Sequence, residues 1–445
     1  MMPSQPHRGS LRARSVLVLA VICMALLAAA GFATFRDDGG PDIPGVHVIS
    51  IPDSNRVTAH VIVPQLPAPA GLAHYTEHLA WLNAVGEEKR DADRHSNAWT
   101  NDYAIGYWLS GAPADLPDIL RTLKGVFAPL EVPEDFAEDE RGIIQREYEY
   151  RVVNNPDAQA GEVMDAFLYE GNAIAASVIG TPQDIAALDY DNARALHVAT
   201  HVPQDARLVV VGGVSEGAVL AAMREAGWPE ADTDEHKVAP PQFDLDAPAT
   251  RAIRHVEADA APRLVWRRVV TLPEPVPFDL LEARTALLRD ILDTNLPGGL
   301  AGPLRFDTMI ASSFGIEIWP IDEDNIELSF RAAPDRDVSL AMLQDAFETT
   351  LEDIARNGIP QTTWSRILGR FDGFWPDWAD ADETADWMAA YVLDRISTLR
   401  EPLSAHELDE LKPALTLAST NALLRALAGE GRTAVAFIGP EERFE

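Results

Sequence analysis

The chain has little cysteine and few cationic residues, and each shortage excludes a class of protein. One cysteine among 445 residues excludes an intrachain disulfide and any cysteine-rich zinc or iron–sulfur site. Lys and Arg number 36 against 70 Asp and Glu, and the net charge of −34 argues against binding to nucleic acid or anionic lipid. The hydrophobic fraction of 47% excludes a disordered chain. Histidine and carboxylate side chains therefore have to hold any metal ion.

An apolar segment without charged residues covers residues 15–35, and several arginines precede it. As a helix rising 1.5 Å per residue it would be about 31 Å long, enough to cross a membrane. The preceding positive charge predicts that residues 1–14 stay in the cytoplasm. We therefore expect a single-pass protein of the inner membrane with its main part in the periplasm. The alternative is a signal peptide cleaved near Ala28–Ala30, which would release the protein into the periplasm.

The rest of the chain is predicted to form two domains, 44–228 and 251–440, joined by an acidic, proline-rich linker, 229–250. Both blocks combine strand-like segments rich in β-branched residues with longer helical segments. The apolar strand at 207–211 (RLVVV) near the end of the first block has a counterpart at 433–437 (TAVAF) in the second. This correspondence indicates an internal duplication, and the lack of strict strand–helix alternation favours the α+β class.

The most specific motif in the sequence is His74-Tyr75-Thr76-Glu77-His78. Residues four apart lie on one face of a helix, so the imidazoles of His74 and His78 can bind one metal ion. Glu77 lies beside them, where it could take a proton from water. Zinc accepts imidazole and carboxylate ligands, and H-x-x-E-H is the inverted form of a metallopeptidase motif. The alternative is a pair of surface histidines beside a carboxylate on an amphipathic helix.

A third ligand has to come from elsewhere, and a helix predicted near residues 133–154 is rich in glutamate. Glu140 and Glu147 are seven residues apart, which places them two turns apart on the same face. One could bind the metal while the other orients a ligand or the water. The alternative is a solvent-exposed acidic face. We expect His197 and His201 to be structural or exposed.

Three segments in this order resemble the pitrilysin/insulinase family of inverted-zincin zinc metallopeptidases, in its short two-domain form. They are GLAHYTEH (71–78), NAWTNDYAIGYWL (97–109) and ERGIIQREYEY (140–150). The resemblance implies two related domains, each a mainly antiparallel sheet with helices packed on one side. It also implies one Zn²⁺ per chain and a role for six residues: His74, His78 and Glu147 as zinc ligands, Glu77 as general base, Glu140 as the supporting acid, and Asn97 in the substrate cleft.

The second block follows the family only in outline. Met309 and Ile316 stand where the family has its substrate-gripping Arg and Tyr, so we expect this chain to lack that pair. Short family members work in pairs, which implies a homodimer or a heterodimer with a related chain. We therefore predict a zinc metalloendopeptidase that hydrolyses peptides or unfolded segments outside the cytoplasmic membrane. The alternative, favoured by the missing pair, is a catalytically silent scaffold or binding subunit of an envelope complex.

Overall fold

The computed structural model describes residues 45–51, 53–86, 95–228, 240, 243–245, 249–371 and 384–445. The segment 15–35, predicted as an N-terminal apolar helix, lies outside these residues. In the part of the chain that is described, no helix is long and apolar enough to cross a membrane. The described residues form two compact units: unit 1 lies within 1–151, 177–241 and 376–402, and unit 2 within 152–176, 242–375 and 403–445.

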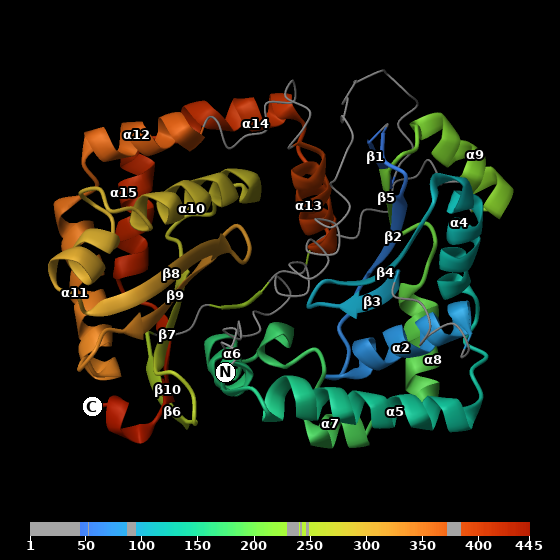
Figure 1. Cartoon of the computed structure of the whole chain (residues 1–445), viewed down its shortest axis with the longest axis horizontal. Coiled ribbons are helices and arrows are strands. Elements are labelled where there is room, and N and C mark those ends of the chain that lie inside the picture. The colour runs from blue at the N-terminus through green and yellow to red at the C-terminus, as the bar shows by residue number, and fades with distance from the viewer. Residues whose placement is uncertain are drawn as a thin grey trace, which may run out of the picture. The chain divides into compact units, whose positions relative to one another are not determined.

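Each unit is built on a five-stranded sheet, and the two sheets have the same strand order (Figure 1). The order is β1–β5–β2–β4–β3 in unit 1 and β6–β10–β7–β9–β8 in unit 2. One pair in each sheet, β1–β5 and β6–β10, is parallel, and the other pairs are antiparallel. The strands are β1 Val46–Ser50, β2 Val57–Pro64, β3 Ser96–Thr100, β4 Ala104–Gly111, β5 Arg207–Gly212, β6 Arg251–Glu257, β7 Arg263–Thr271, β8 Ala311–Pro320, β9 Asn325–Pro334 and β10 Arg432–Gly439.

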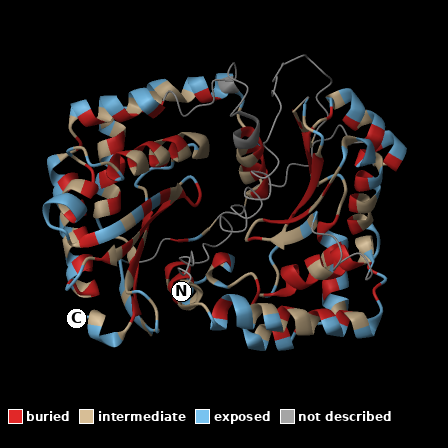
Figure 2. Ribbon diagram, viewed as in Figure 1, coloured by how far each residue is buried: buried red, intermediate tan, exposed pale blue. Residues whose placement is uncertain are grey.

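Most helices lie on one side of each sheet, and Figure 2 shows buried residues where helices and strands meet. In unit 1 these are α2 Leu72–Val85, α4 Leu116–Lys124, α5 Glu134–Tyr148, α7 Pro182–Ala186, α8 Tyr190–Thr200 and α9 Glu216–Ala226. In unit 2 they are α10 Phe278–Leu292, α11 Leu340–Asn357, α12 Gln361–Phe371, α14 Ala405–Leu411 and α15 Leu417–Ala428. Two π-helical turns, η3 Glu149–Val153 and η5 Gly302–Asp307, follow α5 and precede β8. The predicted α+β fold of two related, mainly antiparallel domains is confirmed.

The central strands of unit 1 are buried on both faces, which explains why most of their residues are apolar; Thr58 and His60 of β2 are the buried polar exceptions. Every residue of β2 is buried, and so are all residues of β5 after Arg207. Val61 packs among the helices on one face, while Ile62 and Val209 contribute to a separate apolar cluster on the other. The strand predicted at 207–211 is therefore central rather than at the edge of the sheet.

The second face of each sheet is covered by a helix from the opposite half of the chain. Helix α13, Thr384–Ser397, packs on the sheet of unit 1 through Met388, Val392 and Leu393 among others. Helix α6, Pro156–Leu168, packs on the sheet of unit 2 through residues such as Met164. Each unit therefore depends on a segment that is distant in sequence from its own strands.

Candidate metal centre

The helix that carries the histidine motif, α2, is a central element of unit 1. It begins after Gly71, whose φ of +81° favours glycine and where a Cβ atom would lie 3.0 Å from a backbone oxygen. The Tyr75 hydroxyl donates a 2.9 Å hydrogen bond to the Ala137 carbonyl and joins α2 to α5. His74 is 6% and Glu77 5% exposed. The alternative of surface histidines on an amphipathic helix is therefore excluded.

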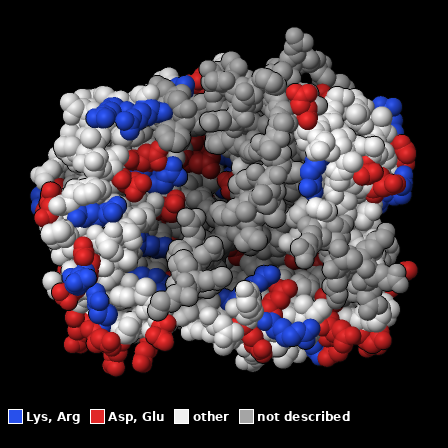
Figure 3. All heavy atoms as spheres, in the orientation of Figure 1, with Lys and Arg blue, Asp and Glu red and all other residues white. Residues whose placement is uncertain are grey.

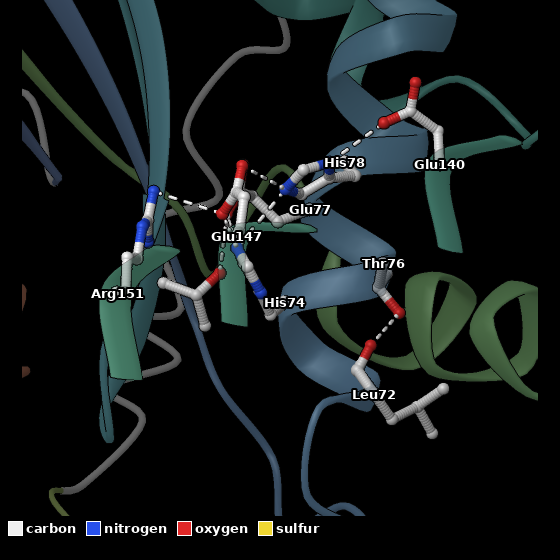
Figure 4. A network of polar contacts seen from close by, with 9 residues as sticks. Leu72, His74, Thr76, Glu77, His78, Glu140, Glu147 and Arg151 are labelled. Atoms are coloured by element: carbon white, nitrogen blue, oxygen red, sulfur yellow. Dashed lines mark hydrogen bonds and ion pairs between the residues drawn. The ribbon is translucent and has the colours of Figure 1, made fainter. Parts of the chain in front are cut away.

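Two histidines and one glutamate converge beside α2 (Figure 4). The Nε2 atoms of His74 and His78 are 3.2 Å apart. Glu147 of α5 completes the group, with its carboxylate oxygens 3.7 Å from His74 Nε2 and 3.8 Å from His78 Nε2. In the part of the chain that is described, this is the one group of His, Cys, Asp or Glu side chains with metal-ligand spacing.

The donor set suits zinc. Ligand atoms about 2.0–2.1 Å from a tetrahedral zinc ion lie about 3.3 Å from one another, close to the spacing of the three donors. Two imidazole nitrogens that face each other at 3.2 Å need a proton or a metal ion between them. Burial lowers the pKa of His74 well below its usual value, and the neighbouring His78 and Arg151 lower it further, so His74 is neutral and can donate a lone pair.

Glu140 fixes the ring of the second histidine. Its Oε2 is 2.9 Å from His78 Nδ1, and its side chain is buried. A proton on Nδ1, donated to this carboxylate, leaves the lone pair of Nε2 directed at the group. The exposed side of α5 carries both acidic and basic side chains (Figure 3). Glu140, in contrast, is the acidic residue of this helix that is buried.

Glu77 lies next to the three donors without completing the same group. Its Oε2 is 3.8 Å from His74 Nε2 and accepts a 3.1 Å hydrogen bond from the Thr100 hydroxyl at the end of β3. Burial raises the pKa of Glu77 to about 7, while His78 and the Thr100 hydrogen bond act in the opposite direction. A carboxylate with a pKa near neutrality can both take and return a proton.

Sequence reasoning missed two residues that contact this site. One is Thr100, the last residue of NAWT, and its signal was its place at the end of a strand in the motif. The other is Arg151 in η3, whose Nη2 lies 3.1 Å from Glu147 Oε2. Its signal was the Glu-x-x-x-Arg spacing, which brings the two side chains together on one helix face.

Asn97 is not brought into the metal group. It is exposed and shares one side of β3 with Trp99, which packs against the cluster that contains α13. The opposite side of the strand carries Thr100 and Ala98, which packs among the helices. The role of Asn97 in substrate binding therefore stays a prediction.

The two remaining histidines singled out in the sequence have structural partners. The rings of His197 and His201 stack with centroids 4.2 Å apart. His201 Nε2 lies 2.8 Å from the Tyr107 hydroxyl, and His197 Nε2 lies 2.7 Å from the Val126 carbonyl oxygen. Both are buried, as expected for structural histidines.

Comparison with known proteins gives partial sequence matches. No family model matches the chain. Over 161 residues it is 26% identical to the beta subunit of mitochondrial-processing peptidase from Bos taurus, covering 34% of this chain and 32% of that protein. Over 173 residues it is 24% identical to the uncharacterized zinc protease YmfH of Bacillus subtilis, covering 38% of this chain and 40% of that protein. The chain thus matches about a third of the length of these relatives.

The fold matches several solved structures over nearly the whole chain. A protease from Helicobacter pylori has a TM-score of 0.68 at 18% identity, covering 89% of this chain and 98% of that one. A putative M16-like peptidase from Alicyclobacillus acidocaldarius has a TM-score of 0.67 at 17% identity, with coverages of 89% and 96%. An M16 peptidase inactive domain from Pseudomonas fluorescens has a TM-score of 0.63 at 15% identity, with coverages of 91% and 97%.

These comparisons agree with the geometry of the histidine–glutamate group. The curated relatives are peptidases or zinc proteases, and the structural neighbours include both peptidases and an inactive domain. The resemblance noted in the sequence is confirmed: this chain has the two-domain, pitrilysin/insulinase-like fold of the M16-like peptidases and is homologous to zinc proteases.

Proposed function

We propose that the chain is a zinc-dependent endopeptidase that hydrolyses peptides or unfolded segments. The observation that carries the proposal is the convergence of His74, His78 and Glu147, with the buried Glu77 beside them. The peptidase relatives support the reaction class, and the donor set supports one zinc ion per chain. Glu140 would hold His78 in the orientation that ligation requires.

Glu77 is the general base of the proposed reaction. Zinc in such a site acts as a Lewis acid, polarising the scissile carbonyl and lowering the pKa of water. Glu77 takes a proton from the water whose oxygen attacks the carbonyl carbon. When the C–N bond breaks, Glu77 gives this proton to the leaving amine. The Thr100 hydroxyl holds one carboxylate oxygen of Glu77, which leaves the other for the transferred proton.

The position of β3 supports an extended peptide as substrate. β3 is an edge strand of the sheet in unit 1 and ends at Thr100, which contacts Glu77. An extended segment can add to such an edge through main-chain hydrogen bonds. A peptide added along β3 would pass directly beside the general base.

Location and assembly extend the proposal. The apolar segment 15–35 and the arginines before it support anchoring in the inner membrane, or release into the periplasm after cleavage, with the peptidase units outside the cytoplasm. The bovine relative is named as a subunit, which supports pairing of this chain with a second copy or a related chain. No role in nucleic-acid binding is proposed, in keeping with the net charge of −34.

A non-catalytic scaffold is the second candidate function, and two observations favour it. The fold is shared with an M16 domain described as inactive, so the fold alone does not establish hydrolysis. In unit 2, Ile316 is buried in the core and Met309 is exposed. Neither residue offers the charged or hydroxyl group with which the family grips its substrate.

Zinc content and peptide hydrolysis of the purified full chain test the two functions together. We expect about one zinc per chain and hydrolysis of an unfolded fluorogenic protein. Glu77→Gln should keep the zinc and lower kcat by about 10²–10⁴-fold, the usual contribution of a general base. Hydrolysis at the wild-type rate in this variant would refute the role of Glu77. A chain that binds no zinc and cleaves nothing, but captures a related chain, would establish the scaffold.

A further inference from the structure

We propose that Arg151 is a positioning residue of the metal centre, which holds the Glu147 carboxylate toward the histidine pair. The inference rests on the proposed zinc site. Arg151 Nη2 lies 3.1 Å from Glu147 Oε2, and the two carboxylate oxygens lie 3.7 and 3.8 Å from the Nε2 atoms of His74 and His78. Figure 4 shows the guanidinium and the histidines on different sides of this carboxylate.

Glu147 is the donor that needs such a partner. The His74 and His78 side chains are 7% and 14% exposed on the central helix α2, and Glu140 fixes the ring of His78. The Glu147 side chain is 26% exposed, and its several rotatable bonds allow its carboxylate to turn toward water. The ion pair with Arg151, a single contact between Nη2 and Oε2, restricts this rotation because it attracts one carboxylate oxygen to the guanidinium.

Arginine suits this task chemically. Its guanidinium stays charged at every physiological pH and offers several N–H donors in a rigid plane. A carboxylate has two oxygens, so one can pair with Arg151 while the other is available to the metal. Arg151 follows Glu147 by four residues and belongs to η3, the π-helical turn directly after α5; such turns are frequent at functional sites.

The positive charge of Arg151 has an opposing effect, since it repels a metal cation. The side chain is 56% exposed, and water screens the charge of so exposed a group. The negative charge of Glu147, which pairs with Arg151, further reduces the repulsion that a metal ion would experience. Orientation of the ligand therefore outweighs repulsion, and removal of Arg151 should weaken zinc binding rather than strengthen it.

Zinc affinity of the purified full chain, measured by competition with a chromophoric chelator, tests this inference. Arg151→Ala should weaken zinc binding about 10–100-fold, the usual cost of losing a group that orients a metal ligand. Arg151→Lys should recover part of the loss, because it keeps the charge without the planar fork. Arg146→Ala is the matched control: it removes the same charge from an exposed position on α5, and its zinc affinity should stay within about threefold of wild type.

Two outcomes separate this inference from the proposed function. If the wild-type chain binds zinc and Arg151→Ala binds it equally or more tightly, the positioning role is wrong while the zinc site stands. If the wild-type chain binds no zinc, both are wrong. Thermal unfolding of the metal-free variants shows whether they are folded. If Arg151→Lys loses both zinc binding and its cooperative unfolding transition, the result counts against a positioning role.

Discussion

The two units share a strand order, yet the helices that follow their second strands differ in chemistry. In unit 1 this helix is α2, which places His74, Glu77 and His78 beside β3. In unit 2 it is α10, which packs against β8 with apolar side chains. The buried leucines and isoleucine of α10 are Leu281, Leu287, Leu288, Ile291 and Leu292. The same topology therefore places a candidate metal group on α2 and apolar core side chains on α10, so function depends on the side chains and not on the fold.

The helices on the second faces of the sheets differ as well. Helix α13 contacts the sheet of unit 1 through an apolar cluster. Helix α6 adds buried ion pairs to its apolar contacts with the sheet of unit 2. Arg267 of β7 lies 2.7 Å from Asp165 of α6 and also pairs with Glu327 of β9, and all three are buried. The stability lost when an apolar side chain is shortened grows with the number of contacts removed. A buried charge that loses its partner, in contrast, is strongly destabilising.

The largest expected effect is the loss of the metal from unit 1. Glu147→Gln removes a charged ligand, and we expect zinc binding to weaken by at least about 10³-fold, or 4 kcal/mol. Glu149→Gln is the matched control, because Glu149 is exposed in η3 and lies outside the metal group. Equilibrium dialysis against radioactive zinc measures both affinities.

Hydrogen exchange locates this effect within the chain. Zinc should slow amide exchange in α2 and α5 and leave α10 unchanged, because the donors come from the first two helices. Equal protection of α2 and α10 would contradict the difference drawn between the units. Loss of zinc from Glu149→Gln with zinc retained in Glu147→Gln would show that the wrong glutamate is assigned.

The second effect is on the ion pairs beneath α6. Arg267→Met leaves Asp165 and Glu327 buried without their cation, which should cost about 3–5 kcal/mol of stability. Because the pair is buried, the cost should change little with salt concentration. The free energy of local unfolding, from hydrogen exchange in β7 and β9, measures it.

An apolar substitution in α13 gives the comparison. Leu393→Ala should cost about 2–4 kcal/mol, with lower protection in β2 and β5 instead. Replacing Arg267, Asp165 and Glu327 together with apolar residues should cost less than Arg267→Met alone, since no charge is left unpaired. A cost for Arg267→Met below about 1 kcal/mol would remove the difference between the two helices.

Local spacing explains why part of the site could be predicted. His74, Glu77 and His78 lie within one helical turn, so their proximity follows from helix geometry alone. Glu140 and Glu147 share a helix face for the same reason, but their approach to α2 came from the family resemblance, because it depends on the packing of α5 against α2. No pattern in the sequence indicated that α6 packs on the sheet of unit 2 and α13 on the sheet of unit 1, since this packing depends on contacts between residues far apart along the chain.

Hydrogen bonds between elements that are distant in sequence also could not be predicted. Thr100 reaches Glu77 because β3 lies beside α2, an arrangement that no local pattern specifies. Asn101, the next residue, accepts hydrogen bonds from the backbone amides of Tyr103 and Ala104, where the turn leads into β4. It also donates a 3.0 Å hydrogen bond to the Ser397 carbonyl of α13. Helix α13 thus supports the turn that follows Thr100 and fixes its position.

The smallest expected effect concerns this threonine and the pH dependence of hydrolysis. The Thr100 hydroxyl donates to Glu77 Oε2, which stabilises the ionised carboxylate and keeps its pKa lower than burial alone would. Thr100→Val removes the donor, so the pKa of Glu77 should rise. Since the base is active only when ionised, the acidic limb of the kcat/KM profile should move to higher pH by about one unit, equivalent to about 1.4 kcal/mol.

Thr100→Ser is the control that separates the hydrogen bond from the shape of the side chain, because serine keeps the hydroxyl and loses only the methyl group. Its acidic limb should coincide with that of the wild type, and both variants should keep their zinc, as Thr100 is not part of the metal group. An unchanged limb in Thr100→Val would mean that the hydroxyl does not tune Glu77. If the limb moves to lower pH instead, the titrating group is not a buried carboxylate whose ionised form is stabilised by the Thr100 hydroxyl. In that case the metal ligands alone would distinguish the chemistry of unit 1 from that of unit 2.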